Sequence, residues 1–216
     1  MQFIDRVEAG RQLAKKLAKY RGRAVVYALP RGGVVVAAEV ARELEAPLDL
    51  ILVRKIGHPA WAEYAICAVA EGGEPVCNPA ERANTSEAWF QATLREARHE
   101  NQRRRWEYFP KGYKAPEVKN KVAILVDDGI ATGLTMEAAV AAIKKRQPKK
   151  IVVAVPVAPS DSVEELKALA DEVIVLDDPA NFRGAVGAHY QNFPQIEDQE
   201  VIEALEEVRD DLAGII

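Results

Sequence analysis

Cysteine and histidine are scarce in this sequence. Of its 216 residues, two are cysteines, Cys67 and Cys77, and three are histidines. Two cysteines cannot build a disulfide framework, although they flank a hairpin expected near Gly72 and Gly73, where cross-strand proximity stays open. We expect two reduced, half-buried thiols. The sequence has no pair of CxxC motifs and no HExxH motif, so a structural metal is not expected.

The sequence also lacks long apolar runs and an excess of positive charge. Its formal net charge is −4, which provides no general attraction for nucleic acid. The first six residues contain no apolar core for a signal peptide. No run approaches the roughly 18 apolar residues of a membrane span. We therefore expect a cytoplasmic protein without a membrane partner, and nucleic acid is not an expected partner either.

Short β-rich runs alternate with helical segments along the chain. Strands are expected at residues 24–29, 48–53, 122–126, 151–155 and 173–176, and helices at 5–20, 34–45, 86–106, 135–146, 162–170 and 198–212. The uninterrupted apolar run 122–126 is typical of a parallel strand that is covered on both faces. The alternation predicts an α/β fold with a doubly wound, mainly parallel sheet. A hairpin near residues 71–74 is expected to interrupt this order.

An acidic pair and a small-residue turn follow the strand 122–126. Asp127 and Asp128 stand at its carboxyl end, where open α/β sheets bind ligands. The turn that follows opens a helix and consists of Gly129, Ile130, Ala131, Thr132, Gly133, Leu134 and Thr135. Free N–H groups and the helix dipole at such a turn suit a phosphate. Because the two carboxylates would repel a simple polyphosphate, we expect an uncharged, hydroxyl-rich group such as ribose between them and the phosphate.

The string from Val126 to Thr135 resembles the binding motif for phosphoribosyl pyrophosphate (PRPP) of type I phosphoribosyltransferases. The rival phosphate motifs fit poorly, because the sequence has no GxxxxGK[ST] and no GxGxxG after its first strand. The resemblance covers most of residues 20–160. It implies one phosphoribosyltransferase domain over residues 1–216, with a flexible lid or insertion at about 56–118 and a small C-terminal hood at about 178–216.

Two basic segments are expected to bind the pyrophosphate. Arg31, Gly32 and Gly33 follow the first strand and resemble the family's pyrophosphate loop, in which glycine N–H groups and a forked guanidinium meet phosphate oxygens. Arg54 and Lys55 end the second strand, where family members carry a basic residue ahead of the lid. We prefer Lys55 as the ligand, with Arg54 as the alternative. An exposed basic strand end without a ligand explains this pair equally well.

The resemblance implies a pentosyltransferase that moves ribose 5-phosphate from Mg–PRPP to a nitrogen acceptor and releases pyrophosphate. Arg31, Lys55 and Mg²⁺ would stabilise the leaving pyrophosphate, while Asp127 and Asp128 would hold the ribose. The Mg²⁺ ion would be held mainly by PRPP, near the two aspartates. One rival is a non-catalytic sensor of PRPP or nucleotides on the same fold, and another is a phosphohydrolase with Asp127 as nucleophile. The oligomeric state stays open, and a homodimer is one option.

The acceptor is not named by the sequence, but one class is disfavoured. Family enzymes for hypoxanthine and guanine generally carry an acidic residue where this chain has Ala131, and that acid exchanges a proton with the purine. Many also place a lysine after the next strand, whereas the first lysine after residues 151–155 here is Lys167. We therefore expect no efficient transfer to oxopurines. Phe182, Tyr190 or Phe193 could stack on a flat base, and ordinary packing explains them as well.

A dense run of arginines lies in the expected helix 86–106. Its arginines are Arg95, Arg98, Arg103, Arg104 and Arg105, and they alternate with glutamates. The alternation favours a solvated, ion-paired helix face over an RNA-binding surface.

Overall fold

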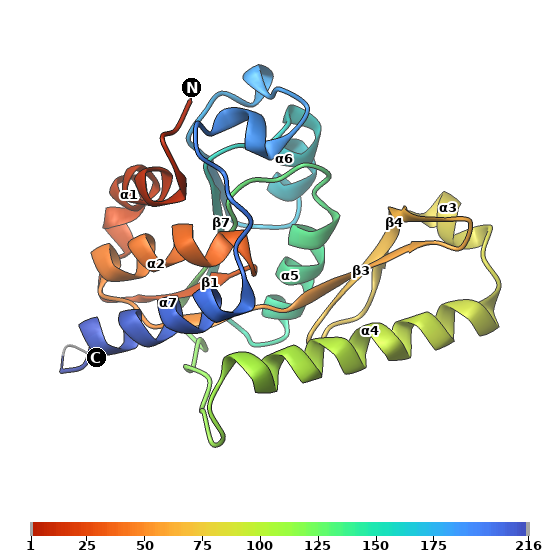
Figure 1. Ribbon diagram of the computed structural model, residues 1–216, viewed down its shortest axis with the longest axis horizontal. Coiled ribbons are helices and arrows are strands. Elements are labelled where there is room, and N and C mark those ends of the chain that lie inside the picture. Colours follow the sequence, from red (N-terminus) through yellow and green to blue (C-terminus); the bar gives the residue numbers. More distant parts are fainter. Residues whose placement is uncertain (1, 215–216) are drawn as a thin grey trace.

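Five parallel strands form the main sheet of the protein. The computed structural model describes residues 2–214, and the strand order of this sheet is β2-β1-β6-β7-β8 (Figure 1). The strands are β1 (Ala24–Ala28), β2 (Leu48–Leu50), β6 (Val122–Val126), β7 (Lys150–Val155) and β8 (Glu172–Val175). All four pairings are parallel, so the carboxyl ends of the strands gather at one edge. The predicted α/β fold with a mainly parallel sheet is confirmed.

Helices cover both faces of the main sheet. One face packs against α1 (Arg6–Leu17), α2 (Gly32–Leu44) and α7 (Asp198–Asp211), and the other against α5 (Leu134–Lys144) and α6 (Ser160–Lys167). In β6, Ile124 belongs to the first core, whereas Ala123 and Leu125 belong to the second. Because successive side chains of a strand point to opposite faces, two covered faces require the continuous apolar run seen in the sequence.

A second, antiparallel sheet extends from the main sheet and carries a long helix (Figure 1). Its elements are β3 (Val53–His58), β4 (Trp61–Ala70), β5 (Val76–Cys77), α3 (Pro79–Ala83) and α4 (Glu87–Tyr108). Ile56 and Ile66 of the sheet pack against Phe90 and Leu94 of α4 in a separate small core. The predicted strand 48–53 was wrong in one respect: the chain leaves the main sheet after β2, and β3 pairs with β4 instead.

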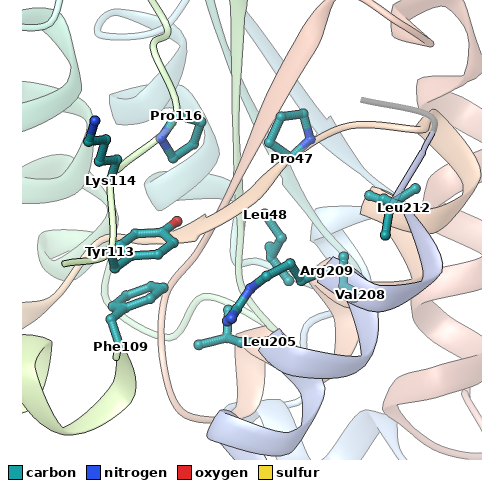
Figure 2. Close-up of a pocket in the computed structure, with 11 residues that line it drawn as sticks. Pro47, Leu48, Phe109, Tyr113, Lys114, Pro116, Leu205, Val208, Arg209 and Leu212 are labelled. Carbon is teal, nitrogen blue, oxygen red and sulfur yellow. The ribbon is translucent and has the colours of Figure 1, made fainter. Parts of the chain in front are cut away.

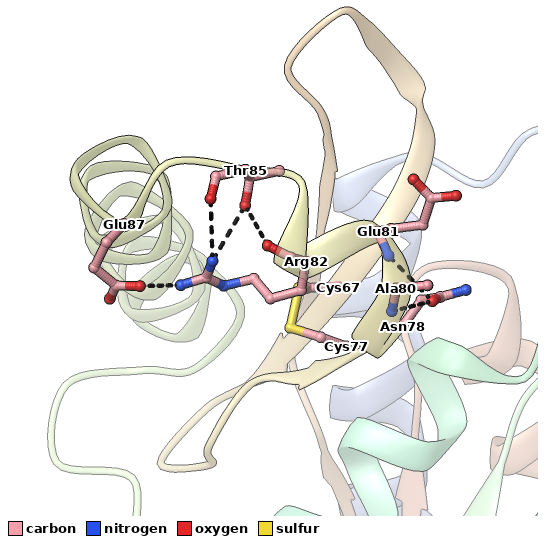
Figure 3. The surroundings of a disulfide bond; sticks show 8 residues. All are labelled: Cys67, Cys77, Asn78, Ala80, Glu81, Arg82, Thr85 and Glu87. Carbon is pink, nitrogen blue, oxygen red and sulfur yellow. Dashed lines mark hydrogen bonds and ion pairs between the residues drawn. A yellow bond between two sulfur atoms is a disulfide. The ribbon is translucent and has the colours of Figure 1, made fainter.

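A disulfide joins β4 to β5 within this second sheet (Figure 3). Cys67 lies directly opposite Cys77 in the strand register, and their Cα atoms are 4.0 Å apart. The expectation of two reduced thiols was therefore wrong, because the hairpin that we predicted brings the two side chains together across the strands. The chain continues at once into α3, whose N-terminus is capped by the Asn78 side chain, which accepts from the Ala80 and Glu81 N–H groups.

The C-terminal segment after β8 folds back over the N-terminal segment. It contains two short 3-10 helices, η2 (Pro179–Asn181) and η3 (Val186–His189); a further one, η1 (Ala18–Tyr20), extends α1. Phe3 forms a bridge with Tyr190, and both side chains are buried in a small cluster. Within residues 2–214, no helix combines the length and the apolar character that crossing a membrane would need.

Candidate functional site

Asp127 and Asp128 lie at the carboxyl end of β6, in the middle of the main sheet. The Asp128 N–H donates to Asp127 Oδ1 at 2.8 Å, and the Tyr190 hydroxyl donates to the Asp128 carbonyl oxygen at 2.6 Å. The neighbouring strand β1 ends in register with β6. The turn that follows β1 therefore lies beside the aspartates, so the two predicted binding segments are neighbours in space.

Gly32 and Gly33 allow the β1–α2 turn to touch this acidic pair. A Cβ atom at Gly32 would lie 1.9 Å from Asp128 Oδ2, and one at Gly33 would lie 2.8 Å from Asp127 Oδ1. Both distances are well below van der Waals contact, so a side chain at either glycine would displace a carboxylate. The peptide bond between Pro30 and Arg31 at the start of this turn is cis.

Arg6, in the first turn of α1, is the site residue that sequence reasoning missed. Its Nε donates to Asp128 Oδ2 at 2.7 Å, and its Nη1 donates to the Pro194 carbonyl oxygen at 2.7 Å. Its guanidinium carbon also lies 3.7 Å from the centre of the Phe193 ring. The Arg6 side chain is 7% exposed and that of Asp128 15%, so the ion pair is largely shielded from water. A signal did exist: Arg6 falls on the buried face of α1 with Ala9, Gly10, Leu13 and Leu17.

Burial disfavours the charged forms of both carboxyl groups of the acidic pair. Burial raises the pKa of Asp127 well above its usual value, and the neighbouring Asp128 charge raises it further. Burial also raises the pKa of Asp128, but the hydrogen bond and the charge of Arg6 oppose this shift. Arg6 therefore stabilises the charge of Asp128 but does not contact Asp127. A ligand whose hydroxyl groups donate hydrogen bonds to Asp127 would stabilise the charge of that carboxylate.

A cavity of about 120 Å³ lies over the turn between β6 and α5. Its lining consists of Lys55, Asp127, Gly129, Ile130, Ala131, Thr132, Gly133, Thr135, Met136 and Val186. Gly133 precedes α5 with a φ of 72°, a backbone conformation that favours glycine. The first N–H groups of a helix have no partner within the helix and attract anions. The cavity thus joins one carboxylate, one ammonium group and a helix N-terminus.

The remaining basic candidates differ in their surroundings. Arg31 forms ion pairs with Glu197 at 3.5 Å and Asp198 at 3.8 Å, next to the N-terminus of α7. Arg54 does not line the small cavity and instead lines a separate one between β3 and α4. Lys55 lines both cavities. Its position favours Lys55 over Arg54 as a phosphate ligand.

The aromatic residues of the C-terminal segment pack on one another. Tyr190 is buried, and its ring centre is 4.8 Å from that of Phe193. The Phe193 ring is also covered by the Arg6 guanidinium. Phe182 stacks on His189 at 5.4 Å. Ordinary packing therefore explains Tyr190 and Phe193 better than stacking on a base does.

Residues 4–192 match the family of the phosphoribosyl transferase domain. The chain belongs to this family. The match covers both the acidic pair and the turn that follows it, together with the β1–α2 turn and Lys55. The family membership that the motif predicted is therefore confirmed.

Known proteins from two bacteria resemble this chain over nearly its whole length. Two Mycobacterium tuberculosis proteins, "Putative phosphoribosyl transferase Rv0571c" of strain H37Rv and "Putative phosphoribosyl transferase MT0597" of strain CDC 1551, are each 44% identical over 214 residues. That alignment covers 98% of this chain and 48% of either relative, so the chain spans about half of their length. The crystal structure of TT1426 from Thermus thermophilus is 43% identical, with a TM-score of 0.81 over 96% of this chain and 99% of that one.

Proposed function

We propose that this phosphoribosyltransferase transfers ribose 5-phosphate from Mg–PRPP to a nitrogen acceptor and releases pyrophosphate. One observation carries the proposal: both aspartates lie against the β1–α2 turn on one side, and on the other side Asp127 lines the cavity over the α5 N-terminus. Two anion-binding turns therefore flank two hydrogen-bond acceptors. PRPP has the matching order, with a phosphate, a ribose diol and a pyrophosphate.

Each part of the site has a proposed role. The turn from Gly129 to Thr135 binds the 5′-phosphate through N–H groups and the hydroxyls of Thr132 and Thr135. Asp127 and Asp128 accept hydrogen bonds from the ribose diol. They also place negative charge near the sugar carbon as its bond to the leaving pyrophosphate breaks. Arg6 acts through Asp128, because it fixes the orientation of that carboxylate and favours its charged form.

The acidic pair also suits a hard cation. Within residues 2–214, no cluster of three or more His, Cys, Asp and Glu side chains is arranged to hold a metal. Asp127 and Asp128 are the oxygen ligands that we propose to lie near a Mg²⁺ ion held mainly by PRPP oxygens. Such an ion would neutralise part of the pyrophosphate charge.

Arg31→Ala and Lys55→Ala are each expected to weaken pyrophosphate binding about tenfold, because each removes a charge-assisted hydrogen bond. Affinity for ribose 5-phosphate should change little, since neither side chain is assigned to that group. Isothermal titration with the two ligands separately measures both effects. Equal losses for both ligands would show that these residues act through the shape of the loop.

Arg54→Ala is the matched control for Lys55→Ala, because both are exposed basic residues of β3. We expect Arg54→Ala to leave pyrophosphate affinity almost unchanged. The reverse ranking of the two variants would assign the pyrophosphate to Arg54 and contradict the cavity-based choice of Lys55.

The oxopurines hypoxanthine, guanine and xanthine are expected to be poor acceptors. Ala131 lines the phosphate cavity and offers no carboxylate for proton exchange with a purine. The assay incubates the protein with Mg–PRPP and each of many nitrogenous bases and amines, and measures released pyrophosphate and the new nucleotide by mass spectrometry. Robust nucleotide formation from an oxopurine would overturn the expectation.

The same assay separates catalysis from sensing. A transferase releases pyrophosphate in the presence of its acceptor. A PRPP sensor on the same fold binds Mg–PRPP and releases none with any acceptor. A phosphohydrolase that uses Asp127 would release inorganic phosphate instead.

A further inference from the structure

A third cavity, of about 330 Å³, lies beside the edge strand β2 (Figure 2), and neither Asp127 nor Asp128 lines it. One wall is the face of α7 that carries Leu205 and Val208, which lie three positions apart on one side of the helix, and it is continued by Leu212, the residue directly after α7. The opposite wall belongs to the loop after α4 and contains Phe109 and Tyr113. The volume falls at the lower end of the range of small-molecule sites, roughly 300–1,000 Å³.

The aromatic wall of this cavity is fixed from behind. The Phe109 and Tyr113 rings stack with their centres 4.1 Å apart. On the side of Phe109, the Arg105 guanidinium carbon lies 4.4 Å from the ring centre. Arg105 is itself held by the fully buried Asp49 at 2.9 Å and by the Leu50 carbonyl oxygen at 3.1 Å. A flat apolar surface is thus held in place by a buried ion pair, before any ligand binds.

Two cations line the rim of the cavity. Lys114 comes from the loop, and Arg209 extends from α7 toward the aromatic pair (Figure 2). Among residues 2–214, neither side chain forms an ion pair, while the acidic neighbours Glu207 and Asp211 on α7 are engaged by Arg42. Apolar walls beside positive charges that no acidic side chain of residues 2–214 pairs with are complementary to an apolar anion.

We infer that this cavity binds a small, flat, apolar molecule with one negative charge, such as an aromatic carboxylate or sulfonate. The ring of the ligand would lie between the Phe109–Tyr113 wall and α7, and its anionic group would pair with Arg209, while Lys114 adds positive charge from the loop side. This site is distinct from the proposed PRPP site. Glu197, next to Arg31, and Arg209 at the cavity lie about 18 Å apart along α7.

The probe for this site is 8-anilinonaphthalene-1-sulfonate, and its neutral counterpart is N-phenyl-1-naphthylamine. We expect the unaltered chain to bind the anionic probe in a saturable, one-to-one manner by fluorescence titration. The double variant Lys114→Met/Arg209→Met should weaken binding of the anionic probe about fivefold, since one exposed charge contact and a second nearby positive charge are lost. It should leave the affinity for the neutral probe unchanged.

Ala213→Trp tests the location, because Ala213 lines the cavity and is exposed, so the indole should fill the space without disturbing the core. The affinity for both probes should fall at least tenfold in this variant. If circular dichroism shows that Ala213→Trp does not fold, Pro116→Trp replaces it as the blocking variant, because Pro116 lines the cavity from the opposite side. Lys15→Met/Lys16→Met removes the same charge from an exposed part of α1 and should have no effect.

Three results would overturn the inference. One is unaltered probe binding in a folded variant with a blocked cavity. Another is an equal loss of the anionic probe in the α1 control. The third is displacement of the probe by Mg–PRPP, which would place it in the other site.

Discussion

Replacing Asp127 and Asp128 together by Asn is expected to reduce the affinity for Mg–PRPP by about 30-fold. Each charged acceptor becomes a neutral one, and a hydrogen bond to a charged acceptor is worth roughly 1 kcal/mol more than one to a neutral acceptor, so the two changes sum to about 2 kcal/mol. Asn keeps the shape of the side chain and an oxygen that can accept from the Asp128 N–H or from Arg6. The loss should therefore appear in binding and not in the fold. Isothermal titration with Mg–PRPP, together with circular dichroism, measures both.

Asp210→Asn/Asp211→Asn is the matched control for that double variant. It removes two neighbouring carboxylates from the C-terminal end of α7, where both are exposed. Mg–PRPP affinity should stay within about twofold of the unaltered chain, since only weak, screened long-range charge effects remain. A folded Asp127→Asn/Asp128→Asn variant with unchanged affinity would refute the assignment of the ribose diol.

The single variants are expected to separate stability from binding. Asp127→Asn should increase the free energy of unfolding at pH 7 by on the order of 1 kcal/mol, because it removes a buried charge beside another carboxylate. This corresponds to roughly 2–4 °C in Tm for a chain of this size. Asp128→Asn should increase the free energy of unfolding by less, because this variant also loses the ion pair with Arg6. Both variants should still bind Mg–PRPP more weakly.

The gain from Asp127→Asn should depend on pH. The native pKa of Asp127 lies above its ordinary value, so the folded state binds this proton more tightly than the unfolded state does. Stability of the unaltered chain is thus lost as pH rises from about 4 through the raised native pKa. Asn does not titrate, so the two proteins should converge in acid and differ most near neutrality.

Urea unfolding at a series of pH values checks this pattern. Arg6→Met is the informative companion variant, because it removes the compensation for Asp128 and should lower stability at neutral pH. A gain from Asp128→Asn as large as that from Asp127→Asn would contradict the role given to Arg6. So would a gain from Asp127→Asn that is the same at every pH.

The sequence predicted the central features because they follow from local rules. The apolar run before Asp127 requires a strand covered on both faces, and the turn after Asp128 has the glycines and hydroxyls of a phosphate-binding helix start. Parallel strand ends gather at one edge, and the register of β1 with β6 brings Gly32 and Gly33 against the aspartates.

Other features depend on contacts between distant segments. The bond between Arg6 and Asp128 joins residues 122 positions apart, and no local pattern specifies such a partner. The change of sheet after Leu50 depends on β4 competing as a partner for β3. The Cys67–Cys77 disulfide needed the exact strand register of the hairpin, which the turn sequence alone left open. Tertiary pairing decided each of these cases.

The most direct test of the central claim is an isothermal titration of the unaltered chain with Mg–PRPP. The proposed site predicts saturable one-to-one binding that Mg–ATP does not reproduce, because ATP carries its whole polyphosphate at the 5′ position of the ribose and a base, not a pyrophosphate, at carbon 1. It also predicts that ribose 5-phosphate and pyrophosphate each compete with Mg–PRPP. No binding at millimolar Mg–PRPP by the folded chain, or equal affinity for Mg–ATP, would contradict a PRPP site at Asp127 and Asp128.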